Sequence, residues 1–215
     1  MPARLMHHTP LPVCSHAIRT CYQSFELSDE GGPKDQALIN KVGNIYKHAS
    51  TLEHLVYSFY LDGISRALLQ ELARHRIASL SVKSTRYTLK ELVEERSFII
   101  ASEIFDMGRV EQYCVLTGNS KVDHSIAKAL EELRGLKAQG ISNDVAKFAL
   151  PDAYKTELTW TINARALQNF LTLRTGKAAM WEIRILAYAI YDALPEDHKY
   201  IFDSCVTPRE VTDAD

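Results

Sequence analysis

The segment EHLVYSFYLDGISRALLQELARHR, residues 53–76, joins a strand pattern to a helix pattern and decides the class of fold. Alternate residues in its first half are large and apolar: Leu55, Tyr57, Phe59 and Leu61. Because this half is rich in aromatic side chains and reaches Asp62-Gly63, it predicts a strand followed by a turn. In the second half, Leu68 and Leu72 share one helical stripe, which predicts a helix whose last turn carries the charged residues 74–76.

Similar patterns extend in both directions along the chain. Helices are expected at residues 15–24, 34–50, 123–140, 142–151, 163–174 and 177–194, and further strands at 3–8 and 154–162. The apolar stripe of the second of these helices consists of Leu38, Ile39, Val42, Ile45 and Tyr46. Few strands among several long helices predict an α+β fold with a mixed or antiparallel sheet. No glycine-rich Rossmann or P-loop motif follows a strand, so neither unit is expected.

Composition is that of an ordinary globular protein. The chain has 215 residues, 46% of them hydrophobic and 24% charged, with a formal net charge of -2. We expect one domain over residues 1–205 and a polar tail over 206–215. No apolar run approaches the roughly 20 residues of a membrane span, and the first residues lack the apolar core of a secretory signal, which predicts a cytoplasmic protein.

Four cysteines are scattered along the chain without a CxxC pair: Cys14, Cys21, Cys114 and Cys205. This pattern carries no redox or metal signature, so we expect no metal and interpret these residues as small buried or half-buried thiols. His48 and His54 could form a zinc site with Glu53, but no further ligand occurs at a usual spacing.

Residues 70–92 carry uncompensated positive charge in a chain that is slightly acidic overall. Between Glu71 and Glu91 the basic residues are Arg74, Arg76, Lys83, Arg86 and Lys90, with no acid among them. The segment could be a solvated face, a nucleic-acid patch, or a set of arginines that complement a helix dipole. However, three adjacent side chains at residues 74–76 fan out and cannot share one solvent direction. Arginine forks and the hydroxyls that follow them suit phosphate, so a loop after residue 76 is predicted to bind it.

Three motifs along the chain resemble those of one known family. RHRIASLSVKS (residues 74–84) has Arg-His-Arg, a seven-residue gap and a serine, and Arg86-Tyr87 follows. This resembles the signature of the flavin-dependent thymidylate synthases, the thymidylate synthase-complementing family. HASTLEH (48–54) and WTINARALQNFLTLR (160–174) are similar to two further elements of that family in order and spacing. The resemblance covers most of the chain.

The resemblance implies an activity and its reactants. Family members convert dUMP to dTMP, take the carbon from 5,10-methylenetetrahydrofolate, and use bound FAD that NADPH reduces. They are homotetramers whose active sites are assembled from several subunits. We therefore expect these small molecules and further copies of the chain as partners, and neither nucleic acid nor membrane.

Carried over residue by residue, the resemblance also implies a site. The expected FAD contacts are Ser24, Ser50, Arg74, His75, Arg76, Asn163, Arg165 and Asn169. The expected dUMP contacts are Glu71, Arg74, Ser84, Thr85, Arg86, Lys147 and Arg174. His48 is expected near the flavin ring and folate. Arg174 is the expected catalytic residue, because it would contact the uracil and favour loss of its N3 proton.

Two departures and several alternatives remain. Val82 stands where many members have glutamate, and Lys147 stands where arginine contacts dUMP. Ser84 could be a nucleophile, but no base lies beside it in the sequence, which favours phosphate binding. The chain could also be a non-enzymatic nucleotide or nucleic-acid binder, or a flavoprotein that has lost the synthase activity.

The helix at residues 163–174 has polar residues on two sides. At 100° per residue, Asn163 and Arg174 lie nearly in line beside apolar residues, whereas Arg165 and Asn169 lie elsewhere on the circumference. Asn163 could also be a simple helix cap. This pattern predicts a helix lodged between partners, with ligands on both sides.

Overall fold

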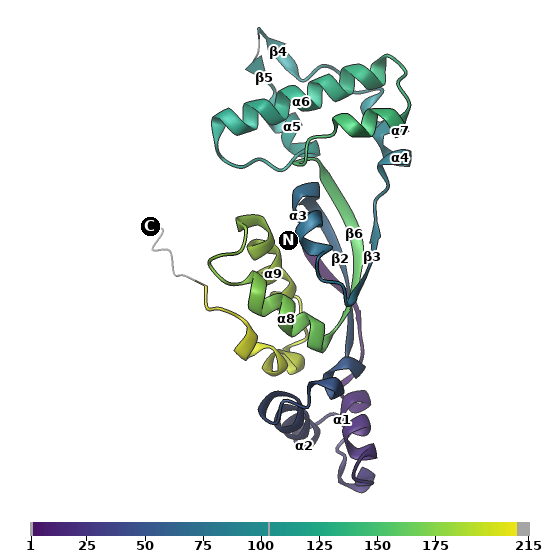
Figure 1. Cartoon of the computed structure of the whole chain (residues 1–215), viewed down its shortest axis with the longest axis vertical. Helices are drawn as coiled ribbons and strands as arrows, with labels where there is room; N and C mark the ends of the chain where they lie inside the picture. Colours follow the sequence, from purple (N-terminus) through teal and green to yellow (C-terminus); the bar gives the residue numbers. More distant parts are fainter. Residues whose placement is uncertain (1, 103, 210–215) are drawn as a thin grey trace. The chain divides into compact units, whose positions relative to one another are not determined.

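The computed structural model describes residues 2–102 and 104–209, which form two compact units (Figure 1). Of these residues, unit 1 comprises 2–61, 71–80 and 159–209, and unit 2 comprises 62–70, 81–102 and 104–158. The fold contains helices and antiparallel strands, as predicted. Most of the expected tail, residues 210–215, lies outside the described residues.

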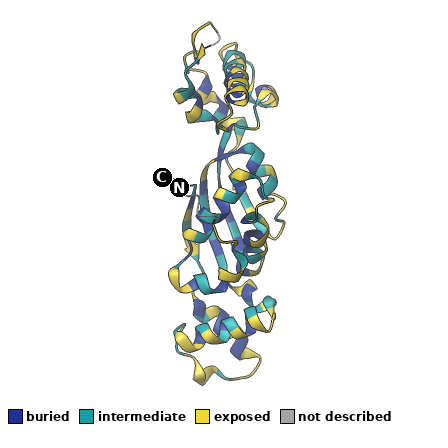
Figure 2. Ribbon diagram, turned by 90° about the vertical axis from the view of Figure 1, so that its left-hand side faces the viewer, coloured by how far each residue is buried: buried dark blue, intermediate teal, exposed yellow. Residues whose placement is uncertain are grey.

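The main sheet has four strands in the order β1-β2-β6-β3. Their bounds are β1 Ala3–His8, β2 Val56–Ser65, β3 Ala78–Val82 and β6 Lys155–Asn163. β1 is antiparallel to β2, with Ala3 opposite Leu61 and His8 opposite Tyr57. Buried residues alternate with partly exposed ones along β2 and β6 (Figure 2), because successive side chains of a strand point to opposite faces. Both strands were predicted from this alternation.

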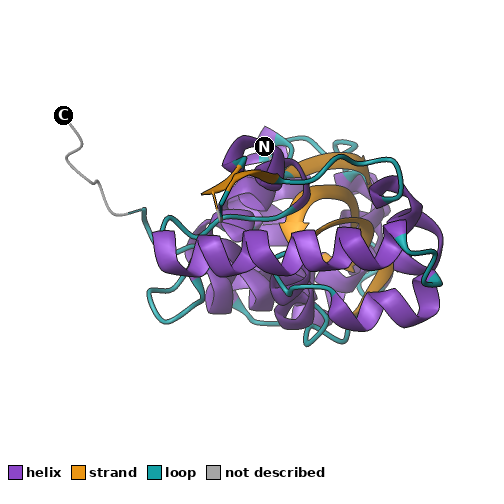
Figure 3. Cartoon of the chain, turned by 90° about the horizontal axis from the view of Figure 1, so that it is seen from above, coloured by secondary structure: helices purple, strands orange, loops and turns teal. Residues whose placement is uncertain are grey.

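Helices account for most of the remaining structure (Figure 3). In unit 1 they are α1 (Leu11–Thr20), α2 (Pro33–Ile39), α8 (Ala164–Arg174) and α9 (Trp181–Asp192), with 3-10 helices at Phe25–Leu27, Ala49–His54, Glu196–Ile201 and Asp203–Cys205. α3 (Arg66–Leu72) follows β2. In unit 2 they are α4 (Thr85–Thr88), α5 (Met107–Tyr113), α6 (Ser120–Ala138) and α7 (Asn143–Ala146), with 3-10 helices at Leu89–Leu92 and Lys147–Ala149. Gly140 follows the end of α6 with φ +80 and donates its N–H to the Lys137 carbonyl, the usual role of a glycine beyond a helix C-terminus.

Four local predictions were wrong. The helix expected at residues 34–50 becomes a π-helix at Asn40–Ile45. A π-turn takes more residues per turn, so it moves the apolar stripe off the core and leaves Ile45 64% and Tyr46 54% exposed. β2 does not turn at Asp62-Gly63 but continues to Ser65, because Gly63 tolerates its φ of +69. The helix expected from residue 177 begins at Trp181.

The fourth concerns the basic segment, which was expected to be a helix end followed by a loop. α3 ends at Leu72, so Arg74 and Arg76 lie in the turn beyond it. The rest forms β3 and α4, because β3 takes the place next to β6 in the sheet. The charge is also offset by acids, two of them from distant parts of the chain. Lys83 lies 3.5 Å from Glu157 and 3.7 Å from Glu91, and Arg86 lies 2.7 Å from Asp144.

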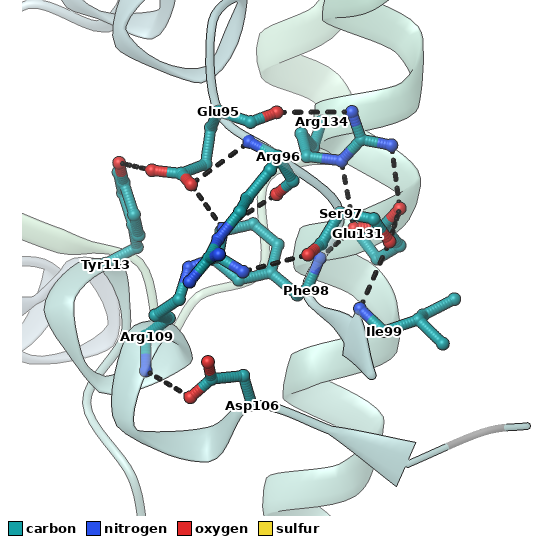
Figure 4. Close-up of polar contacts among 10 residues, drawn as sticks. All are labelled: Glu95, Arg96, Ser97, Phe98, Ile99, Asp106, Arg109, Tyr113, Glu131 and Arg134. Atoms are coloured by element: carbon teal, nitrogen blue, oxygen red, sulfur yellow. Dashed lines mark hydrogen bonds and ion pairs between the residues drawn. The ribbon is translucent and has the colours of Figure 1, made fainter. Parts of the chain in front are cut away.

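A polar network organises residues 95–109 and the adjoining helices of unit 2, where no element was predicted before α6 (Figure 4). Glu95 accepts hydrogen bonds from Arg109 and, at 2.7 Å, from the Tyr113 hydroxyl. Glu131 of α6 accepts the backbone N–H of Phe98 at 2.9 Å and is paired with Arg134. These bonds attach residues 95–98 to α5 and α6. The chain then continues into a two-stranded sheet of β4 (Ile99–Ala101) and β5 (Ile104–Phe105).

Unit 1 contains a buried ion pair between α1 and α2. The Asp35 carboxylate is fully buried and accepts two hydrogen bonds from Arg19, at 2.6 and 3.1 Å. It also accepts from Ser15, Ser28 and the Gly31 N–H. Burial alone would raise the pKa of Asp35, but these donors outweigh it and hold the pKa at about 2. The carboxylate therefore stays charged throughout the neutral range.

A buried histidine gives unit 1 a pH-dependent stability. His198 is 1% exposed, and its Nδ1 lies 2.7 Å from the Tyr57 hydroxyl. Burial lowers the pKa of His198 to about 4. Between pH 6.5 and about 4 the unfolded chain therefore binds a proton that the folded chain does not, so stability falls as pH is lowered.

We expect the free energy of unfolding of wild type to fall more steeply across this window than that of His198→Asn. Asparagine can still accept from Tyr57 but does not titrate, so the difference should approach about 1.4 kcal/mol per pH unit. Urea unfolding at pH 7, 5.5 and 4.5 measures it. Since His75 titrates in the same direction in both proteins, it cancels in the comparison. Equal slopes would show that His198 is not held neutral by folding.

Candidate functional site

A cavity of about 1050 Å³ lies within unit 1. Its lining comes from the turn after α3, from α8, from the segment before α9, and from one 3-10 helix: Arg74, His75, Arg76 and Ile77; Asn163, Arg165, Ala166, Asn169, Leu173 and Arg174; Ala178 and Ala179; and Glu53. The volume of this cavity lies at the upper end of the range for small-molecule sites, and the cavity is large enough for an extended dinucleotide. Seven of the predicted site residues are therefore brought together here.

α8 aims its polar residues at the cavity because its apolar side is fixed in the core. Leu167, Phe170 and Leu171 are fully buried. The Phe170 ring packs edge-on against Trp160 of β6 at 5.0 Å between centroids. At the start of the helix, the Asn163 side chain accepts the N–H of Ala166 at 2.9 Å, so the expected capping role is present as well. Both polar sides of this helix border the same cavity, although the sequence suggested separate partners.

Arg174 is held on one side of the cavity by three hydrogen bonds. Its Nε donates to His75 Nε2 at 3.0 Å, and its two terminal nitrogens donate to the Glu71 carboxylate at 2.9 Å and the Glu71 carbonyl at 3.3 Å. Its side chain is only 16% exposed. Burial, followed by the charge of Arg174, lowers the pKa of His75 to about 4. At neutral pH a permanent cation therefore lies against a neutral imidazole.

The lining of the cavity is strongly cationic. It contains four arginines against one carboxylate, that of Glu53, which accepts a hydrogen bond from Arg165 at 2.7 Å. Arg74 also lies 3.6 Å from Glu71 and remains largely exposed. Such a lining favours a ligand that carries several negative charges. Ile77, Leu173 and the alanines add apolar surface suited to an aromatic ring, so the donor set fits a flavin dinucleotide with its diphosphate and rings.

A second set of predicted residues lies in unit 2. Ser84 occupies the N-cap position of α4, and its hydroxyl makes no capping hydrogen bond. Arg86 donates to Asp144 at 2.7 and 3.3 Å, and its carbonyl accepts from Asn143 at 2.7 Å. Lys147 follows α7 directly. These bonds join α4 to α7, so Ser84, Thr85 and Arg86 at the start of α4 and Lys147 just after α7 flank a pair of contacting helices.

Three residues predicted to lie on the flavin side of the site are outside the lining of the cavity. Ser24 precedes the 3-10 helix Phe25–Leu27, and its carbonyl accepts from Arg19. Ser50 and His48 are exposed, at and just before the 3-10 helix Ala49–His54. Their expected contacts stay predictions. Sequence reasoning missed the role of Glu53 as the partner of Arg165. The HASTLEH motif contained the signal, but Glu53 was weighed there only as a zinc ligand.

Two absences hold for the described ranges. Residues 2–102 and 104–209 contain no group of three or more His, Cys, Asp or Glu side chains that could hold a metal ion. Within the same residues, no helix has the length and apolar character needed to cross a membrane.

Fold and cavity together define an α+β protein with an arginine-lined cavity of dinucleotide size. The family model described as thymidylate synthase complementing protein matches residues 4–198. The flavin-dependent thymidylate synthase of Wolinella succinogenes is 63% identical over 202 residues, which are 94% of this chain and 97% of that protein. That of Helicobacter pylori strain 26695 is 55% identical over 201 residues, covering 93% and 96%.

Solved structures agree with these relatives. The flavin-dependent thymidylate synthase ThyX of Helicobacter pylori, complexed with FAD and dUMP, superposes with a TM-score of 0.91 at 53% identity, over 96% of this chain and all of that one. The chain belongs to the thymidylate synthase complementing family, the flavin-dependent thymidylate synthases. The family, the fold class and the synthase function predicted from the sequence are confirmed.

Proposed function

We propose that this chain converts dUMP to dTMP with the methylene carbon of 5,10-methylenetetrahydrofolate and with electrons that NADPH delivers to bound FAD. The observation that supports this most is the convergence of Arg74, His75 and Arg76 with Asn163, Arg165, Asn169 and Arg174 around one cationic cavity. These seven residues belong to two family motifs, at residues 74–84 and 160–174, that are about 90 residues apart in the sequence.

The residues of unit 1 divide between a cofactor and a uracil. Arg74, His75, Arg76, Asn163, Arg165 and Asn169 would hold FAD, with Ser24 and Ser50 as further contacts and His48 near its ring. FAD, when bound, supplies the hydride that no amino-acid side chain can supply. The guanidinium groups would neutralise its diphosphate, and the amides would bond to its ring edges.

Arg174 would act on the electronic state of the uracil. Methylation needs a nucleophilic C5, and electron density at C5 rises when N3 loses its proton or when the resulting anion is stabilised. Arg174 cannot give up a proton at neutral pH, so it contributes a fixed positive charge and N–H donors. Because it is mostly buried, this charge acts with little screening by water.

Ser84, Thr85, Arg86 and Lys147 would bind the dUMP phosphate, with Glu71 and Arg74 as further nucleotide contacts. Arg86 would share its guanidinium between Asp144 and the phosphate. Lys147 supplies charge without the bidentate fork of arginine, and Val82 supplies only backbone. We further propose a homotetramer with shared active sites, a cytoplasmic location, a single domain over residues 1–205, and no nucleic-acid or membrane partner, on the strength of family membership.

The function is tested by spectroscopy and by isotope release. The purified protein is expected to be yellow and to release tritium from [5-³H]dUMP only when FAD, NADPH and methylenetetrahydrofolate are all present. A yellow protein without release would identify a flavoprotein scaffold that lacks the synthase activity. A colourless protein that binds DNA or RNA with steep salt dependence would identify a nucleic-acid module instead.

Ser84→Ala is expected to retain turnover. If Ser84 binds phosphate, the loss of one hydrogen bond should raise the KM for dUMP by roughly 3- to 10-fold and leave kcat nearly unchanged. Steady-state kinetics measure both constants, and Ser79→Ala, which alters an exposed serine of β3, is the matched control. Normal dUMP binding without detectable turnover would restore the nucleophile hypothesis.

A further inference from the structure

We infer that His75 is a positioning residue for Arg174. The Nε2 atom of its ring accepts a hydrogen bond from Arg174 and thereby holds the plane of the guanidinium toward the uracil. This inference rests on the proposed function, because it assigns to Arg174 the role of uracil contact. It adds a task for His75 that differs from its expected contact with FAD.

Two anchors from one turn of backbone hold the guanidinium. His75 accepts from Nε at 3.0 Å, and Glu71 accepts from the two terminal nitrogens through its carboxylate and its carbonyl. The backbone N–H of His75 donates to the Leu72 carbonyl at 3.1 Å, so both anchors belong to the turn that ends α3. Of the five N–H donors of a guanidinium, the remaining two have no partner among residues 2–102 and 104–209, and they can donate to a ligand in the cavity.

The bond from Arg174 fixes the tautomer of His75. An arginine Nε–H can only donate, so the His75 Nε2 must be unprotonated. The neutral ring then carries its proton on Nδ1. Any polar contact between this ring and the flavin therefore uses Nδ1–H as a donor, and the two tasks of His75 involve different nitrogens.

The His75 ring is itself held by the core. It packs edge-on against Phe170, with 5.0 Å between ring centroids and an interplanar angle of 75°. Phe170 is fully buried on α8, the helix that also carries Arg174. Phe170 thus packs against the His75 ring, and the His75 ring accepts a hydrogen bond from Arg174. Without His75 Nε2 as an acceptor, Arg174 would be hydrogen-bonded to Glu71 alone.

The test separates positioning from cofactor contact. His75→Leu and His75→Ala remove the acceptor, whereas His75→Gln places an amide oxygen near the former Nε2. Each variant is combined with wild-type Arg174 and with Arg174→Lys, which lacks the Nε–H. For every protein, flavin content is measured by visible absorption, the Kd of dUMP by calorimetry on the flavin-loaded protein, and kcat by tritium release.

With Arg174 present, the loss of a charge-assisted hydrogen bond is expected to lower kcat per bound flavin roughly 10- to 100-fold in the Leu and Ala variants. His75→Gln should restore most of kcat. With Arg174→Lys, the same changes at residue 75 should alter kcat and the Kd of dUMP by less than about threefold, because coupled residues are not additive.

Three results would overturn the inference alone while wild type remains active: equal losses in the Leu and Gln variants, losses that follow flavin content, or full additivity with Arg174→Lys. A wild-type protein without dUMP-dependent tritium release would overturn the proposed function, and this inference with it.

Discussion

Replacing Arg174 with alanine is expected to lower dUMP turnover about 100- to 1000-fold, the range seen when a preorganised group that stabilises developing negative charge is removed. The variant should still bind FAD, because the six predicted flavin contacts that line the same cavity are unchanged. Truncation removes the charge and also leaves the Glu71 carboxylate without the closer of its two arginine partners. Visible absorption and tritium release measure the two properties separately.

Arg174→Lys is the matched control for this prediction. It keeps the charge but lacks the planar fork that reaches His75 and Glu71 through separate nitrogens, so its turnover should lie between those of alanine and wild type. Near-normal turnover in Arg174→Ala would remove this residue from the mechanism. Loss of flavin in step with activity would instead assign it to cofactor binding.

Asp35→Ala is expected to lower the free energy of unfolding by about 3–5 kcal/mol, because it leaves the buried Arg19 guanidinium without its countercharge. Three further donors, on Ser15, Ser28 and Gly31, lose the same acceptor. Equilibrium urea unfolding at pH 7 measures the change.

Two controls accompany Asp35→Ala. Glu196→Ala breaks the ion pair between Lys199 and the Glu196 side chain, which is 89% exposed. Its cost in unfolding free energy should therefore be less than about 1 kcal/mol. The double variant Arg19→Met with Asp35→Leu removes both charges and should recover much of the lost stability. A cost for Asp35→Ala no larger than that of Glu196→Ala would contradict the buried ion pair.

Local patterns in the sequence predicted those elements whose form depends on local spacing. The alternation in β2 and β6 predicted strands, and the Asn163 cap with its apolar stripe predicted α8. β3 was missed although its residues ASLSV alternate apolar and polar, because this five-residue run lies within a basic, hydroxyl-rich segment that favoured a loop, and its strand form depends on pairing with the neighbouring β6. The π-helix was missed because the stripe through Ile45 and Tyr46 assumed an unbroken α-helical period.

The site was predictable as a set of residues but not as a set of contacts. The family motifs pointed to Arg74, His75 and Arg174 without showing that one donates to another. The bond between His75 and Arg174 joins residues 99 positions apart, and no periodic pattern encodes a contact of that range. The pairing of Arg165 with Glu53, 112 positions apart, was missed for the same reason. Such contacts arise only when the fold brings α8 beside the turn after α3 and beside the 3-10 helix Ala49–His54.

The most direct test of the central claim is a crystal structure of this protein soaked with FAD and dUMP. We expect flavin density against residues 74–76 and α8, with the uracil within hydrogen-bond distance of the two free N–H groups of Arg174. Arginine side chains that extend into bulk solvent, with both compounds elsewhere or unbound, would contradict it.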